Sequence, residues 1–254
     1  MSVMTNRQTK SAAQHPVSSG NPCPFLRALV ASGQLPDGQV LVSTVVSTVI
    51  EAAAKGEGAP RIPALAARAI AMSANGVDPV TVFRTTTQGV RLDKLRNGPF
   101  DKRGVGSRII DAAGNIDPIE LARLKTFASP KVIGSGLTVL GLDSDEINRF
   151  MKANLKRAGD RGRLVDRALM NGEWPVLLKV MGKDSQDGRY LSFDDVQTLV
   201  VEKRLPDRMV GLWGSCCGLA MHCWYIKLCY RPIDSGASSS LFDSYVRFHC
   251  KCRG

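Results

Sequence analysis

Cys23 is the residue of this chain whose type and position are best suited to chemistry. It is the only cysteine among residues 1–215, so this part of the chain holds no second thiol for a disulfide. Pro24 follows directly and is typical of the first position of a helix. A helix N-terminus directs open N–H groups and a positive dipole end at the preceding side chain, and Arg27 adds a cation one turn later. The sequence therefore predicts a Cys23 thiolate, the form that ligates iron strongly.

The residues around Cys23 also follow a recognisable pattern. A Pro-Cys-Pro tripeptide is followed by leucine, alanine, glycine and proline at fixed offsets, at Pro22, Cys23, Pro24, Leu26, Ala28, Leu29, Gly33, Leu35 and Pro36. This stretch resembles the signature of the fungal chloroperoxidase and haem-thiolate peroxygenase family. The resemblance implies that Cys23 is the axial ligand of the iron of haem b, with Pro24, Phe25 and Arg27 beside the cofactor. It further implies a peroxidase or peroxygenase that uses hydrogen peroxide to oxidise a small organic substrate.

Such an enzyme also needs a carboxylate that moves protons on bound peroxide. The distal Glu-His-Asp or Glu-Gly-Asp tripeptide of the family is absent from this chain, since Glu57-Gly58 is followed by Ala59. Glu120 is our candidate, because it lies at a predicted helix start among apolar residues, where burial would raise its pKa. The alternative role for Glu120 is to stabilise the helix dipole. Without a distal acid, the chain would be a non-catalytic haem-binding protein.

Two stretches resemble degenerate EF-hand loops and suggest a calcium-responsive protein as a further alternative. In the first, Asp111 and Glu120 occupy two ligand positions, but Ile109 and Ala113 occupy two others and supply no side-chain oxygen. In the second, which contains Asp187, one residue too many separates the turn glycine from the closing acid. The sequence therefore offers two interpretations of these stretches. One is calcium or magnesium binding at Asp111, Glu120 and Asp187, and the other, which we favour, is a turn followed by a capped helix.

The composition changes abruptly near residue 210. Residues 210–254 hold six of the seven cysteines, including Cys216, Cys217, Cys223, Cys250 and Cys252, and also His222. Three interpretations are open. The segment is a small binding site for a soft metal, a poor membrane anchor interrupted by Lys227, or the product of a reading-frame change after Met209.

Apolar spacing predicts that the rest of the chain is mainly α-helical, a single multi-helix domain that encloses a cofactor pocket. The stretch 42–53 repeats its apolar residues at helical spacing despite its many valines, so we expect a helix. Asp143 with Glu146 predicts a capping box at the start of another helix. We expect three regions: a flexible arm at 1–20, a helical haem-thiolate-like domain at 21–209, and an atypical cysteine-rich tail at 210–254.

The charge and the N-terminus bear on partners and location. The formal net charge is +11, and basic residues gather at Lys152, Lys156, Arg157, Arg161, Arg163 and Arg167. Phe150 is the only aromatic residue within this group, so we expect a solvated helix face and no nucleic-acid partner. The polar residues 1–20 lack the apolar core of a secretory signal, which predicts a cytoplasmic protein with no membrane partner. The sequence gives no basis for an oligomeric state.

Overall fold

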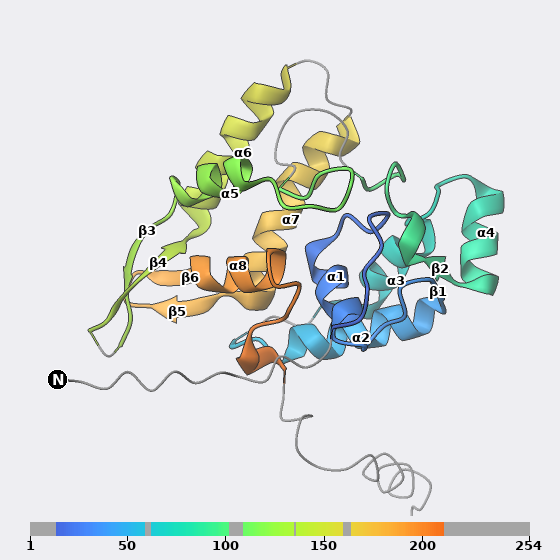
Figure 1. The fold of residues 1–254 in the computed structure, drawn as a ribbon, viewed down its shortest axis with the longest axis horizontal. Helices are drawn as coiled ribbons and strands as arrows, with labels where there is room; N and C mark the ends of the chain where they lie inside the picture. Colours follow the sequence, from blue (N-terminus) through green and yellow to red (C-terminus); the bar gives the residue numbers. More distant parts are fainter. Residues whose placement is uncertain (1–13, 59–61, 102–108, 135, 160–163, 211–254) are drawn as a thin grey trace, which may run out of the picture. The chain divides into compact units, whose positions relative to one another are not determined.

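The computed structural model describes residues 14–58, 62–101, 109–134, 136–159 and 164–210, with backbone alone for 164–172. All of these residues belong to one compact unit that ends at Gly211. The described residues form eight α-helices and six short strands (Figure 1). The helices are α1 (Pro24–Ala31), α2 (Val42–Ala54), α3 (Ala64–Ser73), α4 (Pro79–Gln88), α5 (Pro118–Lys125), α6 (Ser144–Ala158), α7 (Leu164–Met181) and α8 (Phe193–Val200).

The strands show that the expectation of a mainly α-helical fold is wrong, because the chain is mixed α and β. A two-stranded ribbon pairs β1 (Gln39–Val40) with β2 (Val90–Arg91), and a four-stranded antiparallel sheet has the order β3-β4-β6-β5. The strands of this sheet are β3 (Ser129–Val132), β4 (Thr138–Leu142), β5 (Lys183–Ser185) and β6 (Gly188–Ser192).

Apolar periodicity did not predict the four-stranded sheet, because each of its strands has only three to five residues. Pro130 and the buried Lys131 lie within β3, where neither favours a strand by its own propensity. Pro130 is tolerated because β3 is an edge strand of the sheet. Tertiary pairing therefore decides the conformation here, and local propensity does not.

Two predicted elements are confirmed. The valine-rich stretch forms α2 from Val42 to Ala54, so its helical period outweighs its β-branched composition. At the start of α6, the Asp143 side chain accepts hydrogen bonds from Asp145 N and Glu146 N, and the Glu146 side chain accepts from Asp143 N. This capping box fixes the point at which the sheet passes into α6.

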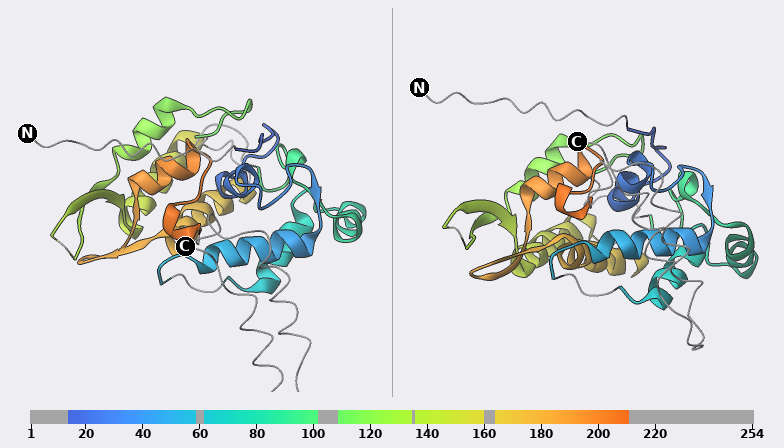
Figure 2. Two further views of the ribbon diagram at one scale, coloured as in Figure 1. Left: turned by 60° about the horizontal axis from the view of Figure 1, so that its bottom comes forward. Right: turned by 90° about the horizontal axis from the view of Figure 1, so that it is seen from below.

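The core joins the four-stranded sheet to α1, the helix that begins directly after Cys23. Helix α8 packs on β4 and β6 and also on α1, and α7 packs on β6 (Figure 1). The two views of Figure 2 place α1 beside α8, with α2 along another side of the same core. Leu29, Leu142, Leu191 and Leu199 are fully buried in this core. Arg27, Ala28, Leu29, Val30 and Ala31 of α1 are buried, so this core holds the helix that begins directly after Cys23.

Candidate functional site

A cavity of about 280 Å³ lies among α1, α3, α7, α8 and the segment after β2. Its volume is close to the lower end of the range for ligand pockets, roughly 300–1,000 Å³. Most of the described lining is apolar, from side chains such as Leu26, Leu177 and Leu199. The polar or ionisable side chains in the described lining are those of Cys23, Arg96, Asp101, Glu173 and Trp174. An apolar cavity with a few polar groups is the usual form of a small-molecule or cofactor site.

Cys23 lies in the wall of this cavity, at the N-cap position of α1. Its backbone is extended, with φ −81° and ψ 115°, and its side chain makes no capping hydrogen bond. Pro24 occupies the first helical position and lines the cavity as well. The Cys23 N–H donates to Asn21 Oδ1 at 3.2 Å, and Asn21 is fully buried. The half-buried thiol is therefore held by a fixed backbone at a positive helix end.

Arg27 fixes the loop that precedes Cys23. Its side chain is only 2% exposed, and Nη1 donates to the carbonyl oxygens of Ser18 and Asn21, each at 3.0 Å. Nη2 donates at 3.1 Å to the carbonyl oxygen of Gly114, in a loop far away in the sequence. Arg27 is not among the described cavity-lining residues, and Phe25 packs against the core. Of the residues expected beside the cofactor, the structure thus brings Cys23 and Pro24 to the cavity.

Two guanidinium groups and two carboxylates surround this loop, because Arg27 lies near Asp37 and Arg96 is paired with Asp101. Burial, and next the neighbouring Arg96 guanidinium, hold the pKa of Arg27 below its ordinary value, while the Asp37 carboxylate acts in the opposite direction. The three hydrogen-bond acceptors of Arg27 are carbonyl oxygens, which carry no net charge. Positive charge beside a thiol favours the thiolate, and at Cys23 the N-terminus of α1 supplies such a charge. The closeness of Arg96 to Arg27 could not be read from the sequence around Cys23, because Arg96 comes from the segment after β2.

Arg96 and Asp101 form a polar corner of the cavity. Arg96 Nη1 lies 3.6 Å from Asp101 Oδ1, and Arg96 Nη2 donates to the carbonyl oxygen of Asp111 at 2.6 Å. Arg96 Nε is buried and has no hydrogen-bond acceptor among the described residues. Since a buried N–H without an acceptor costs about 1–3 kcal/mol, this corner is suited to a ligand that brings an acceptor.

Glu173 is the acidic residue of α7 that lines the cavity, and sequence reasoning did not select it. It directly precedes the apolar run Trp174–Met181, in which Trp174 and Met181 are buried. The signal that the sequence offered for Glu173 was a single acidic residue directly before an apolar run. Without the tertiary structure, nothing related this carboxyl group to Cys23, about 150 positions away in the sequence.

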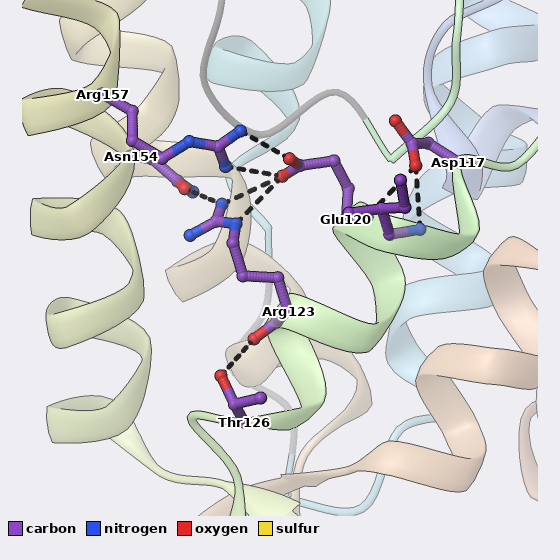
Figure 3. Close-up of polar contacts among 7 residues, drawn as sticks. Asp117, Glu120, Arg123, Thr126, Asn154 and Arg157 are labelled. Carbon is purple, nitrogen blue, oxygen red and sulfur yellow. Dashed lines mark hydrogen bonds and ion pairs between the residues drawn. The ribbon is translucent and has the colours of Figure 1, made fainter.

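Glu120, the predicted distal acid, lies elsewhere. Its carboxylate accepts from Arg157 Nη2 at 2.7 Å, from Arg157 Nη1 at 3.0 Å and from Arg123 Nη2 at 3.0 Å (Figure 3). Burial alone would raise the pKa of Glu120, as expected from the sequence, but the bonds from Arg157 and Arg123 hold it below its ordinary value. Glu120 is not among the described cavity-lining residues. The cluster joins α5 to α6 and is not arranged for proton transfer at the cavity.

The residues considered for calcium are engaged in turns and ion pairs. Asp111 Oδ1 accepts from Asn115 N at 2.8 Å, and both Glu120 oxygens are bonded to guanidinium groups. Asp187 is exposed in the two-residue turn between β5 and β6, where Ser185 pairs with Gly188. Within the described ranges, no three histidine, cysteine, aspartate or glutamate side chains gather in a way that could hold a metal ion. The predicted turn at Asp187-Gly188 is confirmed as a hairpin turn.

Other predictions concern residues outside the described ranges. These are the thiols and His222 of the tail, which all lie within residues 211–254. Among the described residues, no helix has the length and apolar character needed to cross a membrane.

Comparison with known proteins gives no assignment of its own. No protein-family model matches the chain, and no curated protein shows significant similarity to it.

Proposed function

We propose that this chain is a haem-thiolate peroxidase or peroxygenase that oxidises a small organic substrate with hydrogen peroxide. The observation that carries the proposal is the position of Cys23, at a helix N-terminus and in the wall of an apolar cavity. The kinds of residue in the cavity wall are those that would hold a haem, and a cavity of about 280 Å³ would have to widen to admit the macrocycle. Cys23 would hold the iron, apolar side chains would face the macrocycle, and Arg96 Nε–H would gain a propionate as its missing acceptor.

Haem bound in this way supplies an iron that binds peroxide, and its thiolate ligand favours cleavage of the O–O bond. The chain's own residues hold the ligand and move the proton. Asn21 and Arg27 fix the backbone around Cys23, so that the thiolate does not have to be ordered when the cofactor binds. The positive end of α1, at whose N-cap position Cys23 lies, would favour the thiolate over the thiol.

Glu173 replaces Glu120 in this proposal as the general acid-base. Its carboxylate would accept the proton of peroxide and return it to the departing oxygen, a role typically worth about 10²–10⁴-fold in rate. Glu173 fits because it lines the same cavity as Cys23, whereas Glu120 is not among the described cavity-lining residues.

Peroxide-dependent oxidation of a generic phenolic dye tests the proposal. The full chain, reconstituted with haem, is compared with Cys23→Ala, Glu173→Gln and Glu120→Gln. We expect no turnover above that of unbound haem for Cys23→Ala, a loss of about 10²-fold or more for Glu173→Gln, and little change in turnover by folded Glu120→Gln. Wild-type protein that binds haem without turnover would instead indicate the non-catalytic haem-binding alternative. Protein that takes up no haem would contradict both.

A further inference from the structure

Helices α3 and α4 expose an unusual amount of apolar surface. Five large apolar side chains on these helices and the turn between them are well exposed: Leu65 by 81%, Ile70 by 58%, Val77 by 69%, Val80 by 66% and Phe83 by 70%. We call these five residues the α3–α4 surface. Single exposed apolar residues are normal, but a concentration of them marks an interaction site.

The two helices have little other role in the core. The only buried residue of α3 is Ala71, and the only one of α4 is Thr85. The helices pack against each other, and α3 also packs against α2. In Figure 2, α3 lies on the outer side of α2, and α4 lies at the end of the unit remote from the sheet. Both helices are therefore placed to meet a partner.

The α3–α4 surface also adjoins the cavity. Ile70 and Ala74 line the cavity wall from α3, and Phe100, which is 37% exposed, lines it as well. Because Ile70 belongs both to the cavity wall and to the exposed surface, the cavity and the α3–α4 surface are adjacent.

The charges on this side favour an anionic partner. Helix α3 carries Arg68 and no acidic residue, and α4 carries Arg84 directly beside Phe83. The nearby acid Asp78 caps α4, accepting from Thr81 N at 2.9 Å. Hydrogen bonds from Thr81 hold the pKa of Asp78 below its ordinary value, so it stays ionised and the two arginines outnumber one carboxylate. Exposed apolar side chains with adjacent arginines are typical of helices that lie in the interface of an anionic bilayer.

We propose that the α3–α4 surface binds the surface of an anionic phospholipid bilayer, with the cavity adjacent to the lipid contact. This departs from the sequence-based expectation of no membrane partner. The described helices do not meet the length and apolarity needed to cross a bilayer, so the contact is peripheral. The inference goes beyond the proposed activity and does not depend on it, since it uses surface residues and not the cofactor.

Co-sedimentation with vesicles tests this inference on the full chain. We use phosphatidylcholine vesicles with 30 mol% phosphatidylglycerol, a composition of our choice, and vesicles of phosphatidylcholine alone. We expect clear binding to the mixed vesicles and weaker binding to the neutral ones. The double variant Leu65→Ser/Phe83→Ser should lower the partition coefficient by about tenfold or more, because two exposed apolar side chains are removed from the lipid contact.

A matched control separates this surface from exposed apolar residues in general and from residues outside the described ranges. Ile119 on α5 and Leu137 before β4 are 75% and 63% exposed and lie outside the α3–α4 surface. The variant Ile119→Ser/Leu137→Ser should partition like wild type. The inference is overturned if wild type does not bind the mixed vesicles, or if Leu65→Ser/Phe83→Ser binds as well as wild type. Sedimentation velocity tests the alternative that a second copy of the chain covers the surface. If wild type forms a dimer and does not bind vesicles, and Leu65→Ser/Phe83→Ser is a monomer, the surface belongs to a dimer interface and the inference is overturned.

Discussion

Arg27 and Arg157 are both hydrogen-bonded arginines, but their surroundings have opposite electrostatic effects. Arg27 is bonded to three neutral carbonyl oxygens, and burial followed by the Arg96 charge lowers its pKa. Arg157 is bonded to the Glu120 carboxylate, and that bond raises its pKa. The guanidinium of Arg157 is therefore bonded directly to a carboxylate at α5–α6, whereas that of Arg27 is bonded to neutral carbonyl oxygens of the loop before Cys23.

This difference indicates which of the two regions, the Glu120–Arg157 cluster or the loop held by Arg27, is suited to binding a ligand. An ion pair that is already satisfied joins two helices and gains nothing from a further anion. The acceptors of Arg27 are neutral, and the Cys23 loop that it holds lines the cavity. The comparison thus supports a binding role for the Cys23 region and a structural role for the Glu120 cluster.

The largest expected effect comes from removing the guanidinium of Arg27. In Arg27→Gln, carbonyl groups of Ser18, Asn21 and Gly114 lose their donor in a buried place. We expect a loss of about 3 kcal/mol or more in the free energy of unfolding, measured by urea denaturation. Arg149→Gln, at a side chain that is 67% exposed, is the control and should change stability by less than about 0.5 kcal/mol. Equal effects of the two variants would contradict the anchoring role of Arg27.

Removing the charge of Glu120 should have a smaller effect that depends on pH. Glu120→Gln should destabilise the chain by about 2 kcal/mol at pH 7, discounted because Arg157 is 41% exposed. The folded chain holds the pKa of Glu120 below its ordinary 4.5, so the stabilisation is complete above that value and is lost as pH falls through the lowered folded value. Urea denaturation of both proteins at pH 7 and pH 3 checks this. A stability difference that grows toward pH 3 would contradict the sign.

The smallest expected effect concerns the contribution of Arg96 to the charge at Cys23. Arg96→Gln removes the guanidinium that is paired with Asp101 and so makes the local charge more negative, which should lower the fraction of Cys23 that is thiolate at neutral pH. We expect alkylation of Cys23 by iodoacetamide to slow by a few-fold, followed by mass spectrometry of the peptide that contains it. Arg123→Gln, in the Glu120 cluster, should leave the rate unchanged. A faster reaction in Arg96→Gln would show that charge does not control this thiol.

The sequence predicted features that depend on neighbouring residues. The start of α1 at Pro24, the helical period of 42–53 and the capping box of Asp143 are all local, and all are confirmed. The four-stranded sheet was missed because β4 pairs with β6, about 50 residues later, and no local pattern encodes that pairing.

The site was predictable in the same partial way. The Pro22–Pro24 stretch selected Cys23, and the structure places it at a cavity. Glu120 satisfied the local requirement of an acid among apolar residues, but Arg157, on a different helix, determines its environment. Glu173 could not be selected, since its proximity to the cavity results from the packing of α7.

Haem ligation by Cys23 is the central claim, and the ferrous carbon monoxide spectrum tests it most directly. The full chain is reconstituted with haem, reduced and exposed to carbon monoxide, beside Cys23→Ala and the control Cys223→Ser. We predict the red-shifted Soret band of thiolate-ligated haem in wild type and Cys223→Ser, and its loss in Cys23→Ala. A wild-type spectrum without that band, or the same band in Cys23→Ala, would contradict the account.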